Sequence, residues 1–568
     1  MSTNRKIETA VLIVGAGPVG LTLAIDLAWR GIEVTIVERR PAGAAPSVRC
    51  NQISARSMEI FRRLGLATRL REAGLPADYP NDVVSCTTLT GVELSRVMIP
   101  ASAQRYTATS GPDTGWPTPE PPHRINQIYF EPMLFAFAAA QNRIRVLSGA
   151  VVEGFIQDGR EVVAKARHLA TGGTLSITCR YLVGCDGGKS AIRRAIGAAL
   201  EGNPVIQRVQ STCIRAPRLA GLIPSKRAWM YLALNPRRCG TTIAVDGHDT
   251  WLVHNFFYRN EPTFDSVDRD WSIRAILGVG SDFQYEIISK KDWHGCRLVA
   301  GRFRDRRVFI CGDAAHLWLP HAGYGMNAGI ADAANLSWLM AATLRGWAPP
   351  AILDAYEAER LPVADQVSRL VSDFAVRTMQ HRSEIAADIE LAGPAGDAVR
   401  ARVARAAYEL DVEEQCCGGL NFGYSYSGSP VIAYDDESRP TYSMGSFTSS
   451  TTPGCRAPHV WLNRRRSLYD ALGPEYTLIR LDPAAQVAGL VEAAARRRVP
   501  LAVLDVDSTE AQAFYSHNLA LVRPDQHIAW RGNLEPTAPM ELIDLVRGAA
   551  RSQPLAARAE GKSLWQQQ

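Results

Sequence analysis

Three glycines and an acid near the N-terminus have the spacing of a site for a phosphate-bearing ligand. The segment VLIVGAGPVG places Gly15, Gly17 and Gly20 directly after an apolar run typical of a buried parallel strand. In this pattern the first glycine permits a tight turn, the second admits a pyrophosphate, and the third lets a helix pack on the strand. Glu38 ends the next apolar run, where a carboxylate can accept hydrogen bonds from a ribose. The combination predicts a dinucleotide site.

A helix after the glycines, indicated by the apolar stripe of Leu21, Ala24, Ile25 and Ala28, should complete this site. Its free N–H groups and the positive end of its dipole would face the pyrophosphate. An acid at position 38 suits a ribose with a free 2′-hydroxyl and argues against a ligand with a 2′-phosphate at this site. This holds even though Arg39 and Arg40, which could attract a phosphate, follow Glu38. We expect Pro18 and Arg39 to contact the ligand as well. The motif alone does not distinguish NAD from FAD.

Two later segments also run from an apolar strand into a glycine and an acid. RYLVGCDGG ends in Asp186 and Gly187 and leads into a helix. RRVFICGDAAH ends in Gly312 and Asp313 and leads through a glycine-containing loop into an alanine-rich helix. An ordinary β-loop-α connection explains the glycines but leaves Asp313 unexplained.

These three motifs, at these separations, resemble those of the class A flavoprotein aromatic monooxygenases, and the resemblance covers nearly the whole chain. It implies that the dinucleotide is FAD and that Asp313 binds a ribityl hydroxyl. A helix starting near Gly325 would direct its N–H groups to the pyrimidine edge of the flavin. The residues expected to contact FAD are Gly15, Gly17, Pro18, Gly20, Glu38, Arg39, Arg49, Gln127, Asp186, Asp313, Pro320, Gly325, Met326 and Asn327.

The resemblance also implies a reaction. NADPH or NADH would reduce FAD, O2 would form a flavin C4a-hydroperoxide, and one oxygen atom would pass to a phenolic or other aromatic substrate. One alternative is oxygenation or Baeyer–Villiger oxidation of a larger polycyclic substrate derived from a polyketide or an indole. Another is an FAD-binding protein that sequesters an unstable intermediate. The sequence names neither the substrate nor the preferred nicotinamide.

The sequence provides no obvious catalytic base. Relatives in the phenol hydroxylase branch can carry an aspartate shortly after the position of Arg49, where this chain has Asn51, and asparagine cannot take a proton. The family loop Pro-Pro-x-Gly-Gly reads Leu-Pro-His-Ala-Gly here, so His321 could deprotonate a phenol or orient a hydroperoxide. His321 could equally be a surface histidine. Tyr231 and His254 are the next candidates, in that order.

The segment from 205 to 286 alternates polar and apolar residues, which predicts an antiparallel substrate-binding sheet, with a short addition from 83 to 100. Packing within the sheet explains its aromatic residues equally well. The proline-rich stretch Trp116–Arg124 is expected at the surface, either as plain loop structure or as a lid. The expected substrate contacts are Asn51, Trp229, Tyr231, Asn255 and His321.

We therefore expect a multidomain chain of α/β and α+β type with a Rossmann-like FAD-binding domain, an antiparallel-sheet substrate domain and a C-terminal domain. The resemblance to the phenol hydroxylase and polyketide hydroxylase branch implies that the last is thioredoxin-like, and without a CxxC motif a structural or dimer-contact role is favoured. The expected units are residues 1–78, 106–200 and 297–345 for FAD, 79–105 and 201–296 for the substrate sheet, 346–414 for a helical connection, 415–550 for the C-terminal domain and 551–568 for a polar tail.

Composition narrows the function further. Hydrophobic residues make up 46% and charged residues 21% of the 568 residues, with a net charge of +6, which is ordinary for a globular protein. The arginines are dispersed, so nucleic acid is not an expected partner. The apolar run Val11–Trp29 is broken by glycines and by Asp26, which argues against a membrane helix. Eleven cysteines without zinc spacing predict a reducing, cytoplasmic location and no metal. A homodimer is expected from the resemblance alone.

Overall fold

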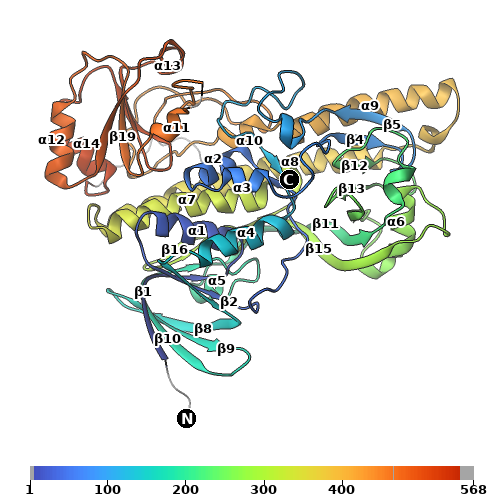
Figure 1. Ribbon diagram of the computed structural model, residues 1–568, viewed down its shortest axis with the longest axis horizontal. Helices are drawn as coiled ribbons and strands as arrows, with labels where there is room; N and C mark the ends of the chain where they lie inside the picture. Colours follow the sequence, from blue (N-terminus) through green and yellow to red (C-terminus); the bar gives the residue numbers. More distant parts are fainter. Residues whose placement is uncertain (1–4, 465, 551–568) are drawn as a thin grey trace, which may run out of the picture.

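The computed structural model describes residues 5–464 and 466–550, and these residues form three larger sheets and one two-stranded ribbon, with helices between them (Figure 1). The expected polar tail, 551–568, lies outside the described residues. Among these residues no helix is long and apolar enough to cross a membrane. Several short elements lie outside the three larger sheets and their main helices. They are β3 (Gln52–Ile53), β6 (His123–Arg124), α2 (Ala55–Arg63), α3 (Ala67–Arg71), α10 (Gly418–Phe422), α11 (Leu468–Ala471) and α13 (Thr509–Phe514).

The first sheet aligns the three motifs. Its strands β2, β1, β10 and β17 are parallel neighbours, so the Gly-rich, Asp-Gly and Gly-Asp segments all leave the same edge. Figure 1 shows α1 (Pro18–Trp29) and α4 (Gln127–Ala139) along this sheet, and α7 (Tyr324–Leu344) packs on α1. The strands are β16 (Arg304–Asp305), β17 (Val308–Ile310), β10 (Thr174–Gly184), β1 (Arg5–Val14), β2 (Val34–Glu38), β7 (Ile144–Ser148), β8 (Ala150–Gln157) and β9 (Val162–His168).

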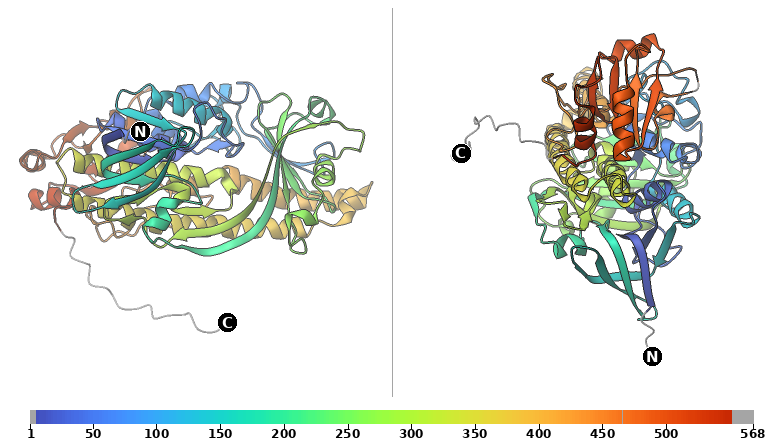
Figure 2. Two further views of the ribbon diagram at one scale, coloured as in Figure 1. Left: turned by 90° about the horizontal axis from the view of Figure 1, so that it is seen from below. Right: turned by 90° about the vertical axis from the view of Figure 1, so that its left-hand side faces the viewer.

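The second sheet is antiparallel except where β12 meets β4, which runs parallel to it because β4 and β5 come from the separate excursion expected at 83–100. Two of its strands, β11 and β15, are long and curved (Figure 2). A segment expected in the FAD domain, β18, joins this sheet instead. Its strands are β18 (His316–Trp318), β15 (Glu286–Ala300), β11 (Leu200–Arg215), β14 (Thr250–Phe256), β13 (Gly240–Ala244), β12 (Met230–Ala233), β4 (Val83–Cys86) and β5 (Glu93–Val97).

Helices cover both faces of the second sheet. On one face lies α6 (Arg269–Leu277), which packs on β13 and β14. On the other side α9 (Pro394–Gln415) packs on β4 and β5 and against α8 (Asp354–Ser383). The expected helical connection therefore contacts the substrate sheet as well as the FAD-binding region. Pro362 lies within α8 without ending that helix.

The C-terminal unit has a four-stranded sheet ordered β20-β19-β21-β22, in which only the β19–β20 pair is parallel. The helix between these two strands, α12, packs with α14. Figure 2 shows this unit at one end of the molecule. Its elements are β19 (Tyr476–Arg480), α12 (Ala488–Arg497), β20 (Leu501–Asp505), β21 (Leu519–Val522), β22 (Ile528–Gly532) and α14 (Pro539–Val546).

The proline-rich stretch Trp116–Arg124 is not the surface loop that its composition suggested. Thr118 is buried and donates a hydrogen bond to Glu59 at 2.7 Å. Glu120, also buried, pairs with Arg71 at 2.9 Å. Because its polar groups find partners inside the protein, the stretch is part of the interior rather than a lid.

Candidate active site

The glycine-rich turn leaves open space at the N-terminus of α1. Gly15 has a φ of +109°, and a β-carbon there would lie 2.4 Å from the carbonyl oxygen of Cys185, so no side chain fits. A β-carbon on Gly17 would meet nothing within 4 Å. Gly17 precedes Pro18, the first residue of α1, and no side chain caps the helix N–H groups. This combination fits a pyrophosphate.

Glu38 is held as a carboxylate beside that turn. It accepts hydrogen bonds from the N–H of Ala16 at 2.6 Å and from the N–H of Arg40 at 2.8 Å. Burial alone would raise the pKa of Glu38, but these bonds and the Arg40 guanidinium hold it below its usual value. Arg40, which also pairs with Glu131 at 2.6 Å, makes the contacts on this side, whereas Arg39 is exposed.

Asp186 ends the neighbouring strand and heads α5 (Ala191–Ala195). One carboxylate oxygen, Oδ2, accepts from the N–H of Ala191 at 2.6 Å, and the other, Oδ1, is buried with no protein partner among the described residues. Arg193 on the same helix donates to the carbonyl of Ala314 at 3.0 Å. The Asp-Gly and Gly-Asp motifs are thereby joined, and Asp186 keeps one oxygen for a ligand.

Asp313 meets two other predicted residues although they lie far away in the sequence. Burial, and then the charge of Asp313, raises the pKa of the Cys50 thiol to about 12. Burial raises the pKa of Asp313 itself, with His316 and Arg49 acting in the opposite direction. The N–H of Gln127 donates to the carbonyl of Arg49 at 3.2 Å. Asp313 is therefore close enough to Arg49 for their charges to interact, and a backbone hydrogen bond connects Arg49 to Gln127.

A buried network of Asp332, His316 and Arg360 stabilises the Gly-Asp turn. Asp332 of α7 accepts from the N–H of Gly312 at 3.2 Å and contacts His316 Nε2 at 2.7 Å. Arg360 of α8 donates to the same carboxylate at 2.7 Å. Burial would raise the pKa of Asp332, but Arg360 and His316 outweigh it and the pKa is lowered. A charged carboxylate thus fixes the turn that carries Asp313.

The side chain of Asn327 is fully used in holding the loop before α7. Its amide nitrogen donates to the carbonyl of Gly323 at 2.7 Å, and its oxygen accepts from the N–H of Ser54 at 2.9 Å. Gln52 donates to the carbonyl of Ala322, whose φ of +54° is unusual for a residue with a β-carbon. The side chain of Asn327 therefore holds the loop, and any contact of this residue with a ligand would have to come from its backbone.

The start of α7 is open at Gly325, where a β-carbon would meet only Nε1 of Trp318, at 3.7 Å. This indole nitrogen is buried and has no hydrogen-bonding partner among the described residues. Trp318 stacks on His316 with ring centroids 4.5 Å apart. Met326 is buried and Pro320 exposed. Open space at the first turn of α1, the unpaired oxygen of Asp186 and this space at α7 together fit FAD.

His321 forms a hydrogen-bonded dyad with an acid that sequence reasoning missed. Its Nδ1 lies 3.0 Å from a carboxylate oxygen of Glu414, which also accepts from the N–H of Ala322 at 2.9 Å. Burial would raise the pKa of Glu414, but His321 outweighs burial and holds it below the usual value. Because an ionised carboxylate only accepts, Nδ1 carries the proton, and in the neutral ring Nε2 keeps its lone pair.

A second buried acid lies one turn earlier on α9. Asp411 accepts from the hydroxyl of Ser85 at 2.9 Å. Burial raises the pKa of Asp411 to about 7, and the charge of Glu414 adds to that rise, while Arg382 opposes it. Nothing in the sequence distinguishes these two acids from the solvated acids of the same helix, since only the fold brings α9 beside His321.

The second sheet presents Trp229 and His254 toward the FAD-binding region. Trp229 is buried in an apolar cluster with residues of β13 and β14, and Tyr129 of α4 packs against it. The pleat places Leu252 of that cluster and His254 on the same face. Nδ1 of His254 contacts the Ser211 hydroxyl at 2.7 Å. Burial, and then Arg382, lowers the pKa of His254 to about 4.

Tyr231 and Asn255 lie on the opposite face of the sheet. The hydroxyl of Tyr231 accepts from the N–H of Ala228 at 2.6 Å, within a cluster that includes Ile276 of α6. Asn255 donates to the side chain of Gln210 at 2.9 Å. Neither points toward the flavin loop, so we withdraw Tyr231 as a base and both residues as substrate contacts.

Asn51 and a neighbouring arginine border the space between the two regions. The side-chain oxygen of Asn51 accepts from Asn126 at 2.6 Å. Arg124, which pairs with Gln52 across the β3–β6 ribbon, is buried and lies 4.7 Å from the ring centre of Trp229. No pattern in the sequence distinguishes Arg124 within its proline-rich stretch.

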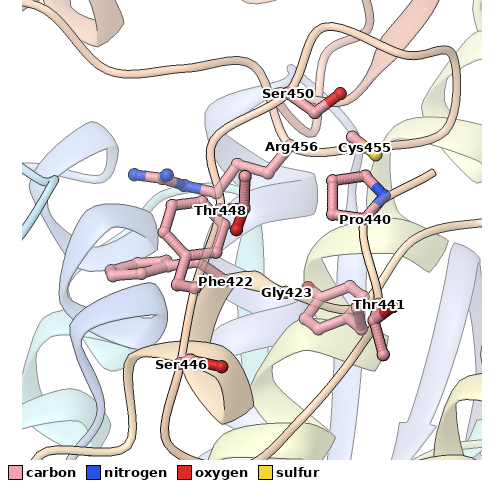
Figure 3. Close-up of a pocket in the computed structure, with 11 residues that line it drawn as sticks. Phe422, Gly423, Pro440, Thr441, Ser446, Thr448, Ser450, Cys455 and Arg456 are labelled. Atoms are coloured by element: carbon pink, nitrogen blue, oxygen red, sulfur yellow. The ribbon is translucent and has the colours of Figure 1, made fainter.

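Figure 3 shows a separate hollow of about 310 Å³, which includes the solvent at its mouth. It lies between α10 and the loops that lead to the C-terminal unit, and Phe422, Thr448 and Arg456 are among its walls. Arg456 is already paired with Glu59 and lies 4.1 Å from the ring centre of Phe422. Because this arginine is committed to structure, the hollow is not part of the candidate active site.

Two family models match the chain. The FAD binding domain matches residues 8–371, more than half of the chain, and the aromatic-ring hydroxylase C-terminal domain matches residues 450–549. The chain belongs to the class A flavoprotein aromatic monooxygenases. It is therefore an FAD-dependent monooxygenase, which agrees with the first sheet and its three motifs.

Relatives match over most of their length. The FAD-dependent monooxygenase opdD of Penicillium oxalicum is 31% identical over 84% of this chain and 95% of its own, and apdD of Emericella nidulans is 29% identical over 99% and 92%. Among solved structures, chromopyrrolic acid-soaked RebC with bound 7-carboxy-K252c has a TM-score of 0.87 and 35% identity, covering 96% of this chain and all of RebC.

Proposed function

We propose that this monooxygenase acts on an aromatic, polycyclic substrate bound between the flavin loop and the face of the second sheet that carries Trp229. The observation that carries the proposal is the buried apolar wall around Trp229, which lies against α4 and α9 on the side of the FAD-binding motifs. Such a wall fits a flat apolar ring system and excludes water from it. The similarity to RebC, which binds 7-carboxy-K252c, supports a substrate larger than phenol and leaves Baeyer–Villiger oxidation as an alternative.

Each side chain has a distinct proposed task. Gly17 and Glu38 would hold the ADP half of FAD, and Asp313 its ribityl chain, while the bound FAD supplies the redox and oxygen chemistry. His321 would accept a phenolic proton at Nε2, since Glu414 orients the ring and stabilises the imidazolium. His254, with its pKa near 4, would stay neutral and orient a hydroxyl.

We further propose NADPH or NADH as the reductant, O2 as co-substrate, a homodimer and a cytoplasmic location. We also propose the domain boundaries expected from the sequence, with one change. Strand β18, expected in the FAD-binding domain, is assigned to the substrate domain because it pairs with β15 of the second sheet. The parallel β19–β20 pair with α12 between, followed by antiparallel β21 and β22, supports a thioredoxin-like C-terminal unit. Without a CxxC motif its role would be structural.

Anaerobic reduction of the flavin tests the proposal. Protein loaded with FAD is mixed with NADPH or NADH, with and without polycyclic phenols, and loss of the visible flavin band is followed. We expect bleaching that at least one polycyclic ligand accelerates more than phenol does. A flavin that no donor bleaches with any ligand contradicts the reductase step and favours a protein that sequesters an intermediate.

His321 has its own test. With a substrate identified in that way, His321→Gln should lower the rate of product formation at least tenfold and remove the acidic limb of its pH profile, with FAD binding unchanged. A variant that hydroxylates at the wild-type rate would show that the base lies elsewhere.

A further inference from the structure

Arg124 is a buried cation without an anion of its own. Arg124 is only 3% exposed, and neither Nε nor Nη2 of its side chain has a hydrogen-bonding partner among the described residues. The ring centre of Trp229 lies 4.7 Å from its guanidinium carbon. A buried charge normally has a hydrogen-bonded counterion, so this arrangement requires an explanation.

The one acid near Arg124 is already used. Asp113 pairs with Arg105 at 2.5 Å through Oδ2 and accepts from the indole N–H of Trp116 at 2.8 Å through Oδ1. Arg105 also has two buried nitrogens, Nε and Nη2, for which the described part of the chain provides no hydrogen-bonding partner. Burial lowers the pKa of Arg124, and Asp113 offsets only part of that effect while Arg105 adds to it. Two guanidinium groups therefore share one carboxylate.

The position of Arg124 connects this excess charge with the proposed substrate space. Gln52, its partner in the β3–β6 ribbon, donates to the carbonyl of Ala322 in the flavin loop. Three residues later Gln127 begins α4, beside Arg49. Trp229, under the guanidinium, belongs to the apolar wall. Arg124 thus stands between the flavin loop and that wall, and a bidentate anion would satisfy its Nε and Nη2 together.

We propose that Arg124 binds an acidic group of the substrate, a carboxylate or an equally acidic enol, and so selects anionic over neutral polycycles. This rests on the proposed function, because it names a chemical class for the ligand of that same site. Arg105 contributes positive charge to the subsite, and Trp229 holds the guanidinium plane in place.

The experiment compares dissociation constants of matched ligands for the FAD-loaded enzyme. 3-Hydroxy-2-naphthoic acid is paired with 2-naphthol, and indole-2-carboxylic acid with indole, and binding is followed by perturbation of the flavin spectrum. We expect the wild type to bind at least one acid ten times more tightly than its neutral partner. Arg124→Met should remove that preference while leaving the neutral ligand within twofold, and Arg124→Lys should retain part of it.

Controls separate this proposal from a structural role and from the proposed function. Arg377→Met, which removes an exposed arginine of α8, should keep the wild-type preference. Because methionine replaces an unpaired buried charge, Arg124→Met should melt no lower than the wild type. An equal acid-to-neutral ratio in wild type and Arg124→Met, or a large fall in melting temperature, overturns the proposal. The ratio of the two dissociation constants is measured without turnover. The acid preference can therefore be absent while NADPH or NADH still bleaches the flavin, and it can be present while neither donor does.

Discussion

Buried side chains around the flavin loop are held in opposite protonation states by their immediate partners. Glu414 stays ionised because His321 and the N–H of Ala322 satisfy it. Burial raises the pKa of Asp411, one turn away, to about 7, and the charge of Glu414 adds to that rise, while the Ser85 hydroxyl and Arg382 offset only part of it. The helix that carries both acids therefore titrates near neutral pH, beside the proposed base.

The raised pKa of Asp411 predicts a stability that falls as pH rises. An unfolded aspartate has a pKa of about 3.9, so between about pH 4 and 7 the folded state binds more protons than the unfolded state, and folding loses free energy as the pH increases. Asp411→Asn cannot ionise and should raise the free energy of unfolding by about 2–4 kcal/mol at pH 8, with little change at pH 4. Urea unfolding at both values measures this. The exposed Asp397→Asn of the same helix is the control, and an equal effect at both pH values would contradict the assignment.

The glycine-rich turn offers a matched pair of substitutions. Gly17 has an extended backbone and open space, so Gly17→Ala should leave the apoprotein as stable as the wild type yet weaken FAD at least tenfold, because the methyl group occupies the pyrophosphate space. Gly15→Ala should instead destabilise the apoprotein by about 2–4 kcal/mol, since its β-carbon meets backbone. Apoprotein melting and FAD titration separate the two effects. If Gly17→Ala binds FAD with wild-type affinity, the pyrophosphate does not lie at this turn.

At the scale of elements, α7 connects the cofactor loops with the helical layer. Its Asn327 holds the loop before it, and its Asp332 holds the Gly-Asp turn and pairs with Arg360 of α8. A single helix thus sets the distance between two motifs that must reach the same ligand.

Arg360→Met tests this junction. It leaves Asp332 buried with only His316 and a backbone N–H, which should reduce the free energy of unfolding by about 3–5 kcal/mol and weaken FAD binding. Arg369→Met, which removes an exposed pair with Asp365 on the same helix, should change stability by less than about 0.5 kcal/mol. Denaturant unfolding and FAD titration provide the comparison, and equal losses in both variants would contradict a special role for α7.

Elements whose function depends on local pattern were predictable from the sequence, and those that depend on packing were not. The strand, turn and helix around Gly15 follow from residues next to one another, and the three motifs meet because parallel strands share an edge. The dyad of His321 and Glu414 joins residues 93 positions apart, and no periodicity signals it. The position of Tyr231 on the far face of the second sheet could not be predicted for the same reason, because an aromatic residue in a buried strand suits either face.

For the whole molecule, buried ion pairs join the C-terminal unit to the rest. Arg523 bonds to both oxygens of Glu359 on α8, at 2.6 and 2.8 Å, and pairs with Asp525 at 2.8 Å. Arg456 pairs with Glu59 of α2. Although burial would raise them, the pKa values of Asp525 and Glu59 are lowered by these arginines. Stability from these two carboxylates is therefore present above about pH 4 and is lost as the pH falls further.

Arg523→Met should uncouple the C-terminal unit. The change leaves Glu359 and Asp525 buried without their shared cation, which should cost about 3–5 kcal/mol at pH 7.5. Because the contact joins two units, we also expect the single unfolding transition to split, and cleavage by a protease to begin in the segment from 423 to 456. Arg480→Met, which removes an exposed pair with Asp505 within the same unit, should leave a single transition and wild-type protease resistance. If Arg523→Met unfolds in one transition and resists the protease like the wild type, then apolar contacts rather than this ion pair hold the unit in place.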